Sequence, residues 1–473
     1  MLLSGLVFLL AGCAGRLPSV YGARGVSPAP DVPWVAPAKA RRVPPPPEAA
    51  ALPESLLAAS AHWTLADLVD IALRQSSETQ IAWMQARSAA AAYGSKRGTY
   101  LPNVTLSADL TRQKSFFVPT GASNVHETGS GSADLSWLLF NFGGRRASVE
   151  ETRQALIAAD WTHNSVIQNV VLEVEQAYYE YVTARALLAA EESTLVEVRV
   201  SLAAADERHR TGLATIADVL QARTSVSQTE FAVQSLKGQI AVTRGALATS
   251  MGLPANTSFD IEPPPLELPV QRVSENVEEY LDRAREQRPD LAAARAQVVE
   301  ADAHTRKVWA DGLPSFSALG NLGRIYVEGS NRPHDTYSVS LQMTFPIFTG
   351  FSHHYDLLQA RADAGTARAR LQNLNQSVVL EVWTSYYNFK TAEEQLRAAN
   401  DLLESATASR EVAFGRYKAG VGSILDLLTA QASLEAARAS QVQARANWFV
   451  SLAYLAHDTG ELGPAEVRKE GTP

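Results

Sequence analysis

The chain has 473 residues, of which 46% are hydrophobic and 19% are charged. Because soluble domains usually carry about 25% charged residues, much of this surface is expected to avoid plain water. The 42 basic and 50 acidic residues give a net charge of -8, and no basic cluster stands out, which argues against nucleic acid as a partner. A single cysteine excludes an internal disulfide framework and a cysteine-based zinc or redox site.

The first 12 residues look like an export signal. The apolar run 2–10 leads into Leu10-Ala11-Gly12-Cys13, with small residues where a secretory cleavage site needs them. This resembles a bacterial lipoprotein signal, in which Cys13 becomes the lipidated first residue and the following Ala14 favours the outer membrane. The alternative is an ordinary cleaved signal with an incidental cysteine. Residues 13–60 are rich in Pro and Ala, which predicts an extended tether.

The remainder of the chain is an internal duplication. At an offset of 208 residues, Val171-Leu172-Glu173-Val174 falls on Val379-Leu380-Glu381-Val382. We therefore expect two structural repeats, at 61–260 and 275–463, joined by a linker at 261–274 and followed by a tail at 464–473. A period of this length is too long for a solenoid, so each repeat is one half of the fold.

Each repeat contains a predicted strand hairpin, at 103–141 and at 315–348. In the first, Val104, Leu106, Ala108 and Leu110 alternate with polar residues, and the segment 337–345 alternates in the same way. Alternation with a period of two predicts strands with one apolar face.

The rest of each repeat is predicted to be helical, with a helix before the strands and a long helical hairpin after them, at 145–250 and 352–459. Apolar residues recur at steps of three and four from Val170 to Ala205, broken only by Glu191, which predicts a coiled-coil seam. At 1.5 Å per residue, about 64 helical residues span about 96 Å.

These elements predict a membrane protein whose strands cross the bilayer. Beyond the signal there is no apolar run of about 18 residues, so a transmembrane helix is not expected. Four strands alone leave sheet edges that lipid cannot satisfy, so the sheet must close across chains. Two chains give eight strands and three give twelve, and the composition does not choose between them.

At this point the sequence resembles the outer membrane efflux protein family, over nearly the whole mature chain. The most specific motifs are the duplicated turns at 210–222 and 417–431, with the strand-to-helix segments 139–143 and 345–350. The resemblance implies a mainly α fold with a membrane β-barrel: a homotrimer with a twelve-stranded barrel and a periplasmic α-barrel of long antiparallel helices. It also implies an exit duct in the outer membrane, extending into the periplasm, that binds a periplasmic adaptor protein and an inner-membrane pump of RND or ABC type. Such a duct is not an enzyme, and cargo selection resides in the pump.

The duplicated turns are the first candidate site. A tight turn between long helices needs residues that tolerate positive φ, which Gly212 and Gly420 supply. The resemblance implies that these glycines, with Leu213 and Val421, form the tip where the adaptor docks. The alternative is that both glycines only cap helices.

The second candidate site is a gate at the same tip. The resemblance implies that Tyr417 hydrogen-bonds Asp218 and holds the tip closed, while Asp426 and Leu425 narrow the aperture. In a trimer each aspartate would form a ring of like charges that favours cations. Two departures from the family pattern, Gly422 and Thr429, predict a more loosely held gate. The alternative for both aspartates is charge stabilisation of a helix N-terminus.

Other functional classes find little support. No catalytic motif, phosphate loop or metal-ligand pattern appears, so we expect no enzymatic activity, no cofactor and no metal. The adjacent His353 and His354 are expected to be solvated. The competing hypothesis is a lipid-anchored periplasmic coiled-coil scaffold or adaptor without a pore, which the long helices alone fit equally well.

Overall fold

The structure is a computed structural model that describes residues 62–117, 122–262, 276–328 and 332–462. The predicted lipidation site Cys13, the tether and the tail lie outside these residues. Within repeat 1 the elements are β1 (His62–Trp63), α3 (Leu65–Gln75), α4 (Ser77–Gly98), β2 (Asn103–Phe117), β3 (Ala122–Phe140), α5 (Gly144–Arg210), α6 (Ile216–Ser250) and β4 (Asp260–Ile261). Within repeat 2 they are α7 (Val277–Gln287), α8 (Pro289–Asp311), β5 (Ser315–Val327), β6 (His334–Thr344), α9 (Ser352–Lys418) and α10 (Ile424–Asp458).

The two strand hairpins form one antiparallel sheet in the order β2-β3-β5-β6. Its apolar face is bare: Leu110 is 94% exposed, Val339 87% and Tyr337 84%. Within the described residues, strands β2 and β6 each have a neighbouring strand on one side only. The sheet therefore ends in two open edges and presents an uncovered apolar face, the arrangement that a membrane barrel needs from each of its chains.

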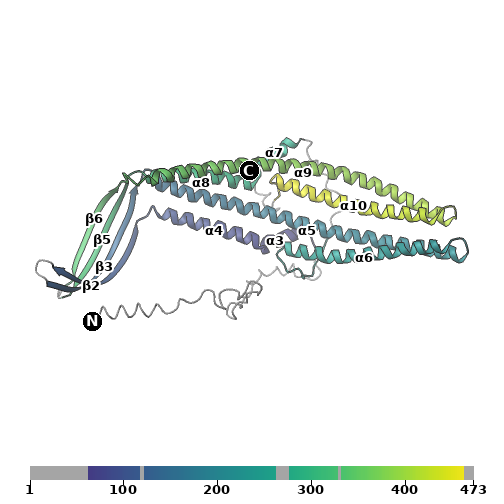
Figure 1. Cartoon of the computed structure of the whole chain (residues 1–473), viewed down its shortest axis with the longest axis horizontal. Helices are drawn as coiled ribbons and strands as arrows, with labels where there is room; N and C mark the ends of the chain where they lie inside the picture. Colours follow the sequence, from purple (N-terminus) through teal and green to yellow (C-terminus); the bar gives the residue numbers. More distant parts are fainter. Residues whose placement is uncertain (1–61, 118–121, 263–275, 329–331, 463–473) are drawn as a thin grey trace. The chain divides into compact units, whose positions relative to one another are not determined.

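The helices pair lengthwise, α5 with α6 and α9 with α10, and α5 also lies against α8 and α10 (Figure 1). The seam expected along α5 is buried at Val170, Val174, Tyr181, Val198 and Ala205. In repeat 2 the equivalent seam of α9 belongs to a cluster of buried apolar residues. This cluster includes Tyr386 and Phe389 of α9 and Trp448 and Phe449 of α10. Among the described helices, none is long and apolar enough to cross a membrane.

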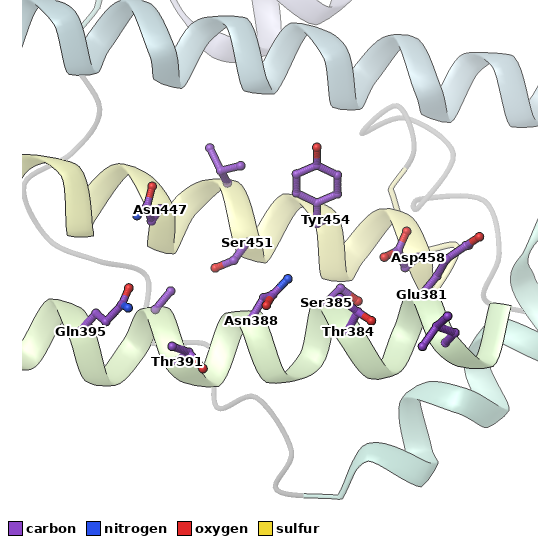
Figure 2. A pocket seen from close by; sticks show the side chains of 13 residues that line it. Glu381, Thr384, Ser385, Asn388, Thr391, Gln395, Asn447, Ser451, Tyr454 and Asp458 are labelled. Carbon is purple, nitrogen blue, oxygen red and sulfur yellow. The ribbon is translucent and has the colours of Figure 1, made fainter. Parts of the chain in front are cut away.

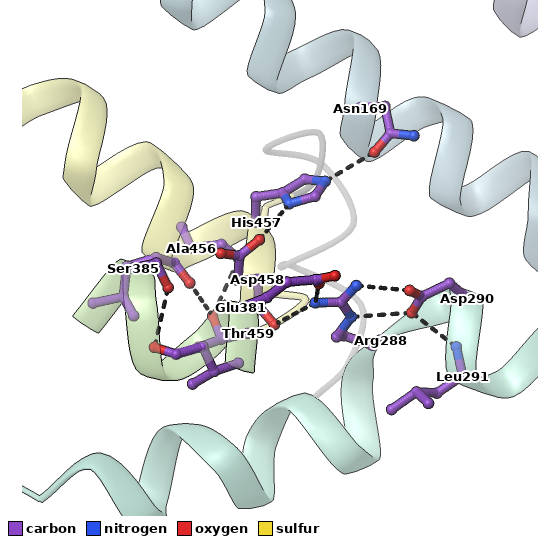
Figure 3. Close-up of polar contacts among 12 residues, drawn as sticks. Asn169, Arg288, Asp290, Leu291, Glu381, Ser385, Ala456, His457, Asp458 and Thr459 are labelled. Atoms are coloured by element: carbon purple, nitrogen blue, oxygen red, sulfur yellow. Dashed lines mark hydrogen bonds and ion pairs between the residues drawn. The ribbon is translucent and has the colours of Figure 1, made fainter. Parts of the chain in front are cut away.

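The predicted single helix before each strand hairpin is in fact two helices. The first break lies at Ser76, which ends α3 and caps α4, its hydroxyl accepting from the Glu78 amide at 3.2 Å. The second lies at Arg288, which is extended and precedes Pro289, the first residue of α8. A residue before proline is driven out of the helical region. Figure 3 shows the Arg288 guanidinium reaching Asp290, Glu381 of α9 and the main-chain carbonyl of Asp458 of α10, so the break is held by ion pairs.

Candidate functional site

The two predicted turns have matching backbone geometry. Gly212 and Gly420 have φ of 78° and 81°, the left-handed conformation that a side chain disfavours. The amide of Leu213 donates to the Arg208 carbonyl at 2.7 Å, and that of Val421 to the Arg416 carbonyl at 3.0 Å. Both glycines therefore end their long helices as expected.

The ends of the two helical hairpins pack on each other through a small apolar cluster. Its buried members are Ala205, Val219 and Ala222 from the first hairpin and Tyr417, Ile424 and Leu427 from the second. The structure thus brings Asp218, Tyr417, Leu425 and Asp426 together at one end of the bundle, although they are far apart in the sequence. We call this region, residues 205–222 and 413–428, the tip.

Asp218 and Asp426 both cap helices. The Asp218 carboxylate accepts from the Thr215 amide at 3.0 Å, while the Thr215 hydroxyl accepts from the Asp218 amide at 3.3 Å. Asp426 and Ser423 form the same reciprocal pair, at 3.3 and 3.1 Å. These are capping boxes with aspartate in the third position. The alternative of helix stabilisation is therefore realised in the fold, and any role in gating comes in addition to it.

Tyr417 is 2% exposed. Its hydroxyl is buried and has no hydrogen-bond partner among the described residues, so the expected bond from Tyr417 to Asp218 is not formed within this chain. Burial raises the pKa of the Tyr417 phenol; the positive charge of Arg208 opposes that shift and the negative charge of Asp218 adds to it. The Asp218 carboxylate accepts instead from the Thr215 amide at the start of its own helix.

The surface of the tip is apolar where the adaptor was expected. Leu213 is 71% exposed, Val421 69% and Leu425 62%. Gly422 lies against the end of α9: an added Cβ would lie 3.1 Å from both the Arg416 Cβ and the Tyr417 amide nitrogen. A basic side chain in place of Gly422 would therefore need the turn to shift.

Sequence reasoning missed a row of polar residues between α5 and α10, on the way from the tip to the middle of the bundle. Gln431 donates to the Ser201 hydroxyl, and Arg438 donates to Thr194 at 3.1 Å and to Glu197 at 2.7 Å. Beyond them Glu191 is 8% exposed, and one of its carboxylate oxygens is buried with no hydrogen-bond partner among the residues that the structure describes. The interruption of the apolar seam at Glu191 was the sequence signal for this row.

A groove of about 750 Å³, lined by both polar and apolar side chains, runs between α9 and α10. Figure 2 shows Asn388 of α9 and Ser451 of α10 pointing into the space between the helices. Its lining offers amides and hydroxyls, and within the described part of the chain no group of His, Cys, Asp and Glu side chains could hold a metal ion. Leu380 of α9 also lines this groove.

Comparison with known proteins decides the family. The model of the outer membrane efflux protein family matches residues 68–253 and 280–461, most of both repeats. The chain belongs to the outer membrane efflux protein family. Protein CyaE of Bordetella pertussis is 29% identical to it over 417 residues, covering 86% of each chain. The toluene efflux pump outer membrane protein TtgC of Pseudomonas putida is 25% identical over 410 residues, covering 82% of each.

Solved structures show the same fold. The outer-membrane channel OprN superimposes with a TM-score of 0.77 at 22% identity, covering 84% of this chain and 90% of that one. The outer membrane protein VceC of Vibrio cholerae gives 0.75 at 20% identity, covering 85% and 96%. The predicted fold class, mainly α with four strands per chain for a membrane β-barrel, is confirmed.

Membership of the outer membrane efflux protein family also fixes the general function. The chain is an outer membrane channel, the exit duct of an efflux or secretion system, and extends into the periplasm. It is not an enzyme. The competing hypothesis of a lipid-anchored scaffold or adaptor without a pore is therefore set aside.

Proposed function

We propose that three copies of this chain assemble into one duct, closed at the tip and opened when a periplasmic adaptor and an inner-membrane pump of RND or ABC type engage it. Each copy would give four strands to a twelve-stranded barrel, with β6 of one subunit pairing with β2 of the next. The observation that carries the proposal is an apolar strip on α9, formed by Leu380, Trp383 and Tyr387, that the described part of the chain leaves exposed.

The duplication indicates what should cover it. In repeat 1 the equivalent positions, offset by 208 residues, are Leu172, Glu175 and Tyr179 of α5. Leu172 is buried beside Ala453 of α10, and the Tyr179 ring stacks on Phe449 of α10 at 4.9 Å. The strip of repeat 1 is thus covered by the last long helix of repeat 2.

In repeat 2 the same strip is open, with Leu380 65% exposed, Tyr387 47% and Trp383 45%. By the symmetry of the duplication its cover is α6 of another copy. The matching face of α6 is small: Gly238 has open space where a Cβ would stand, and Ala241 takes the place of Phe449. Large side chains against small ones permit close helix packing.

The test is the mass of the purified full chain in detergent. Replacing both Trp383 and Tyr387 by Asp should convert the trimer into monomer. Val196→Asp is the matched control: Val196 is 62% exposed, but it lies on α5, whose neighbours on both sides belong to the same chain. A trimer that survives the double substitution contradicts this interface.

We also propose that Asp218, Tyr417, Leu425 and Asp426 restrict the tip. All four lie in the last or first turns of helices that meet at the tip, which supports this, as does the exposure of Leu425 beside Asp426. In planar bilayers the wild-type duct should give small, cation-preferring currents that increase in Asp426→Ala. The absence of current from a correctly assembled wild-type trimer contradicts the proposed duct.

The adaptor is proposed to dock on Leu213 and Val421, which Gly212 and Gly420 hold out from the two turns. Exposed apolar side chains on a rigid turn favour contact with another protein. Leu213→Asp combined with Val421→Asp should leave the conductance of the purified trimer unchanged. In cells the same variant should lose crosslinking, through a cysteine at Thr211, to the adaptor of the same organism. Crosslinking at the wild-type level places the adaptor elsewhere.

A further inference from the structure

Arg208, in the last turn of α5, joins the two helical hairpins of one chain. Its Nη1 donates to the main-chain carbonyl of Tyr417, in α9. Its Nη2 donates to the Leu213 carbonyl of its own turn at 3.5 Å. Its Cζ stands 4.8 Å from the centroid of the Tyr417 ring. One guanidinium therefore contacts both turns of the tip.

The surroundings are arranged for this contact. The Tyr417 carbonyl is at the C-terminal end of α9, where the helix dipole favours a cation, and a charged donor makes a stronger hydrogen bond than a neutral one. A Cβ added at Gly420 would lie 3.8 Å from both terminal nitrogens of Arg208. That is an ordinary contact distance, so the Arg208 guanidinium lies directly against the Gly420 turn.

The contact does not involve the tyrosine hydroxyl. Tyr417 meets Arg208 through its carbonyl and the face of its ring, while its hydroxyl is buried without a hydrogen-bond partner in the described part of the chain. A cation over an aromatic face is held by the ring itself, so phenylalanine can serve as well as tyrosine.

We propose that Arg208 is a positioning residue of the gate: it ties the second hairpin to the first through the ring and carbonyl of Tyr417 and so keeps the tip closed. This rests on the proposed duct. It assigns the closing contact within each subunit to the guanidinium of Arg208, in place of a hydrogen bond from the Tyr417 hydroxyl.

The chain offers a matched control two residues away. Arg210 is in the same turn of the helix, but its side chain is 77% exposed and pairs only with Glu207 of its own helix, at 2.6 Å. Arg208→Ala and Arg210→Ala remove the same charge from the same place. A general electrostatic effect on ion flow should follow from both, whereas release of the tip should follow from Arg208→Ala alone.

The experiment is single-channel recording from the purified full-length trimer, with thermal stability and trimer mass measured in parallel. Arg208→Ala and Tyr417→Leu should raise the ratio of open to closed time by about 5- to 30-fold, the range that corresponds to losing one or two kcal/mol. Arg210→Ala and Tyr417→Phe should match the wild type. Arg208→Lys, which keeps a charge and a donor, should restore part of the closure.

Two results overturn the inference. The first is an equal ratio of open to closed time in Arg208→Ala and Arg210→Ala. The second is an increase in that ratio in Tyr417→Phe as large as in Arg208→Ala, which would assign the closing contact to the Tyr417 hydroxyl. A change in melting temperature or trimer mass that accounts for the increased opening also counts against a specific role for Arg208. Failure of the proposed duct looks different, because an assembled wild-type trimer would then carry no current.

Discussion

The guanidinium of Arg288 makes a two-point ion pair with the carboxylate of Asp290, at 3.0 Å from Nε to Oδ1 and 2.7 Å from Nη2 to Oδ2. Its remaining terminal nitrogen, Nη1, is 2.6 Å from a carboxylate oxygen of Glu381. The Arg288 side chain is 8% exposed, so little water can replace it. The hydrogen bonds and the charge of Arg288 hold the pKa of the Asp290 carboxyl below its usual value, against the opposing effect of burial.

Arg288→Ala should therefore lower the free energy of unfolding by about 1.5–3 kcal/mol, because it removes a buried cation that hydrogen-bonds two carboxylates, Asp290 and Glu381. The control is Arg285→Ala, because Arg285 pairs with Asp282, which is 71% exposed. Loss of this surface ion pair should lower the free energy of unfolding by about 0.5 kcal/mol or less. Thermal denaturation of the purified trimer separates the two. Similar melting temperatures for both variants would mean that the buried pair contributes no more than a surface pair.

The second prediction concerns Glu191, which interrupts the apolar seam of α5. Burial, with a smaller effect from the charge of Glu435, raises the pKa of Glu191 to about 7. The folded-state pKa is thus above the unfolded value of about 4.3. The contribution of protonated Glu191 to the free energy of unfolding is therefore fully present below the unfolded pKa. It is lost as the pH rises through about 7.

Glu191→Gln should consequently stabilise the protein at pH 8 and have little effect at pH 4, with a gain at pH 8 of about 1–3 kcal/mol. Glu192→Gln is the neighbouring control, since Glu192 has a side chain 52% exposed and a surface partner in Lys237 at 3.8 Å. Melting curves across this pH range provide the measurement. If the difference between Glu191→Gln and wild type stays constant with pH, Glu191 does not titrate in this way.

The third prediction compares two glycines at the end of α9. Gly420 has a φ of 81°, so Gly420→Ala should destabilise the turn by about 1–2 kcal/mol. Gly415 is inside the helix with open space around an added Cβ, so Gly415→Ala should stabilise it by about 0.5–1 kcal/mol. Hydrogen exchange at the end of α9 reports both. Equal protection in the two variants would show that backbone conformation does not limit the stability of this turn.

The fourth prediction separates capping from gating at Asp426. Ser423→Ala removes the hydroxyl half of the capping box and should cost about 1 kcal/mol of helix stability while leaving the carboxylate in place. Asp426→Ala removes both the cap and the charge. Only Asp426→Ala should reduce the cation preference of the channel, measured as a reversal potential in a salt gradient. The same loss of preference in Ser423→Ala would assign the effect to the cap.

The sequence alone determined those features that depend on local periodicity and on the duplication. Local sequence predicts the alternation in the strands, the seam from Val170 to Ala205 and the turns at Gly212 and Gly420. The reason is that adjacent residues set the side-chain period and the backbone φ. The family motifs then gave the function. The sequence also places Arg208 three residues beyond Ala205, and so near the same face of the helix.

Only the tertiary structure decided how distant residues meet. No local pattern states that Arg208 of α5 reaches the carbonyl of Tyr417 in α9, or that Arg288 reaches Glu381 of α9. These contacts arise because packing two long hairpins side by side selects, from many polar side chains, the few whose positions coincide. Which side chains meet depends on the axial shift and rotation of one helix relative to another. No single stretch of sequence encodes these two quantities.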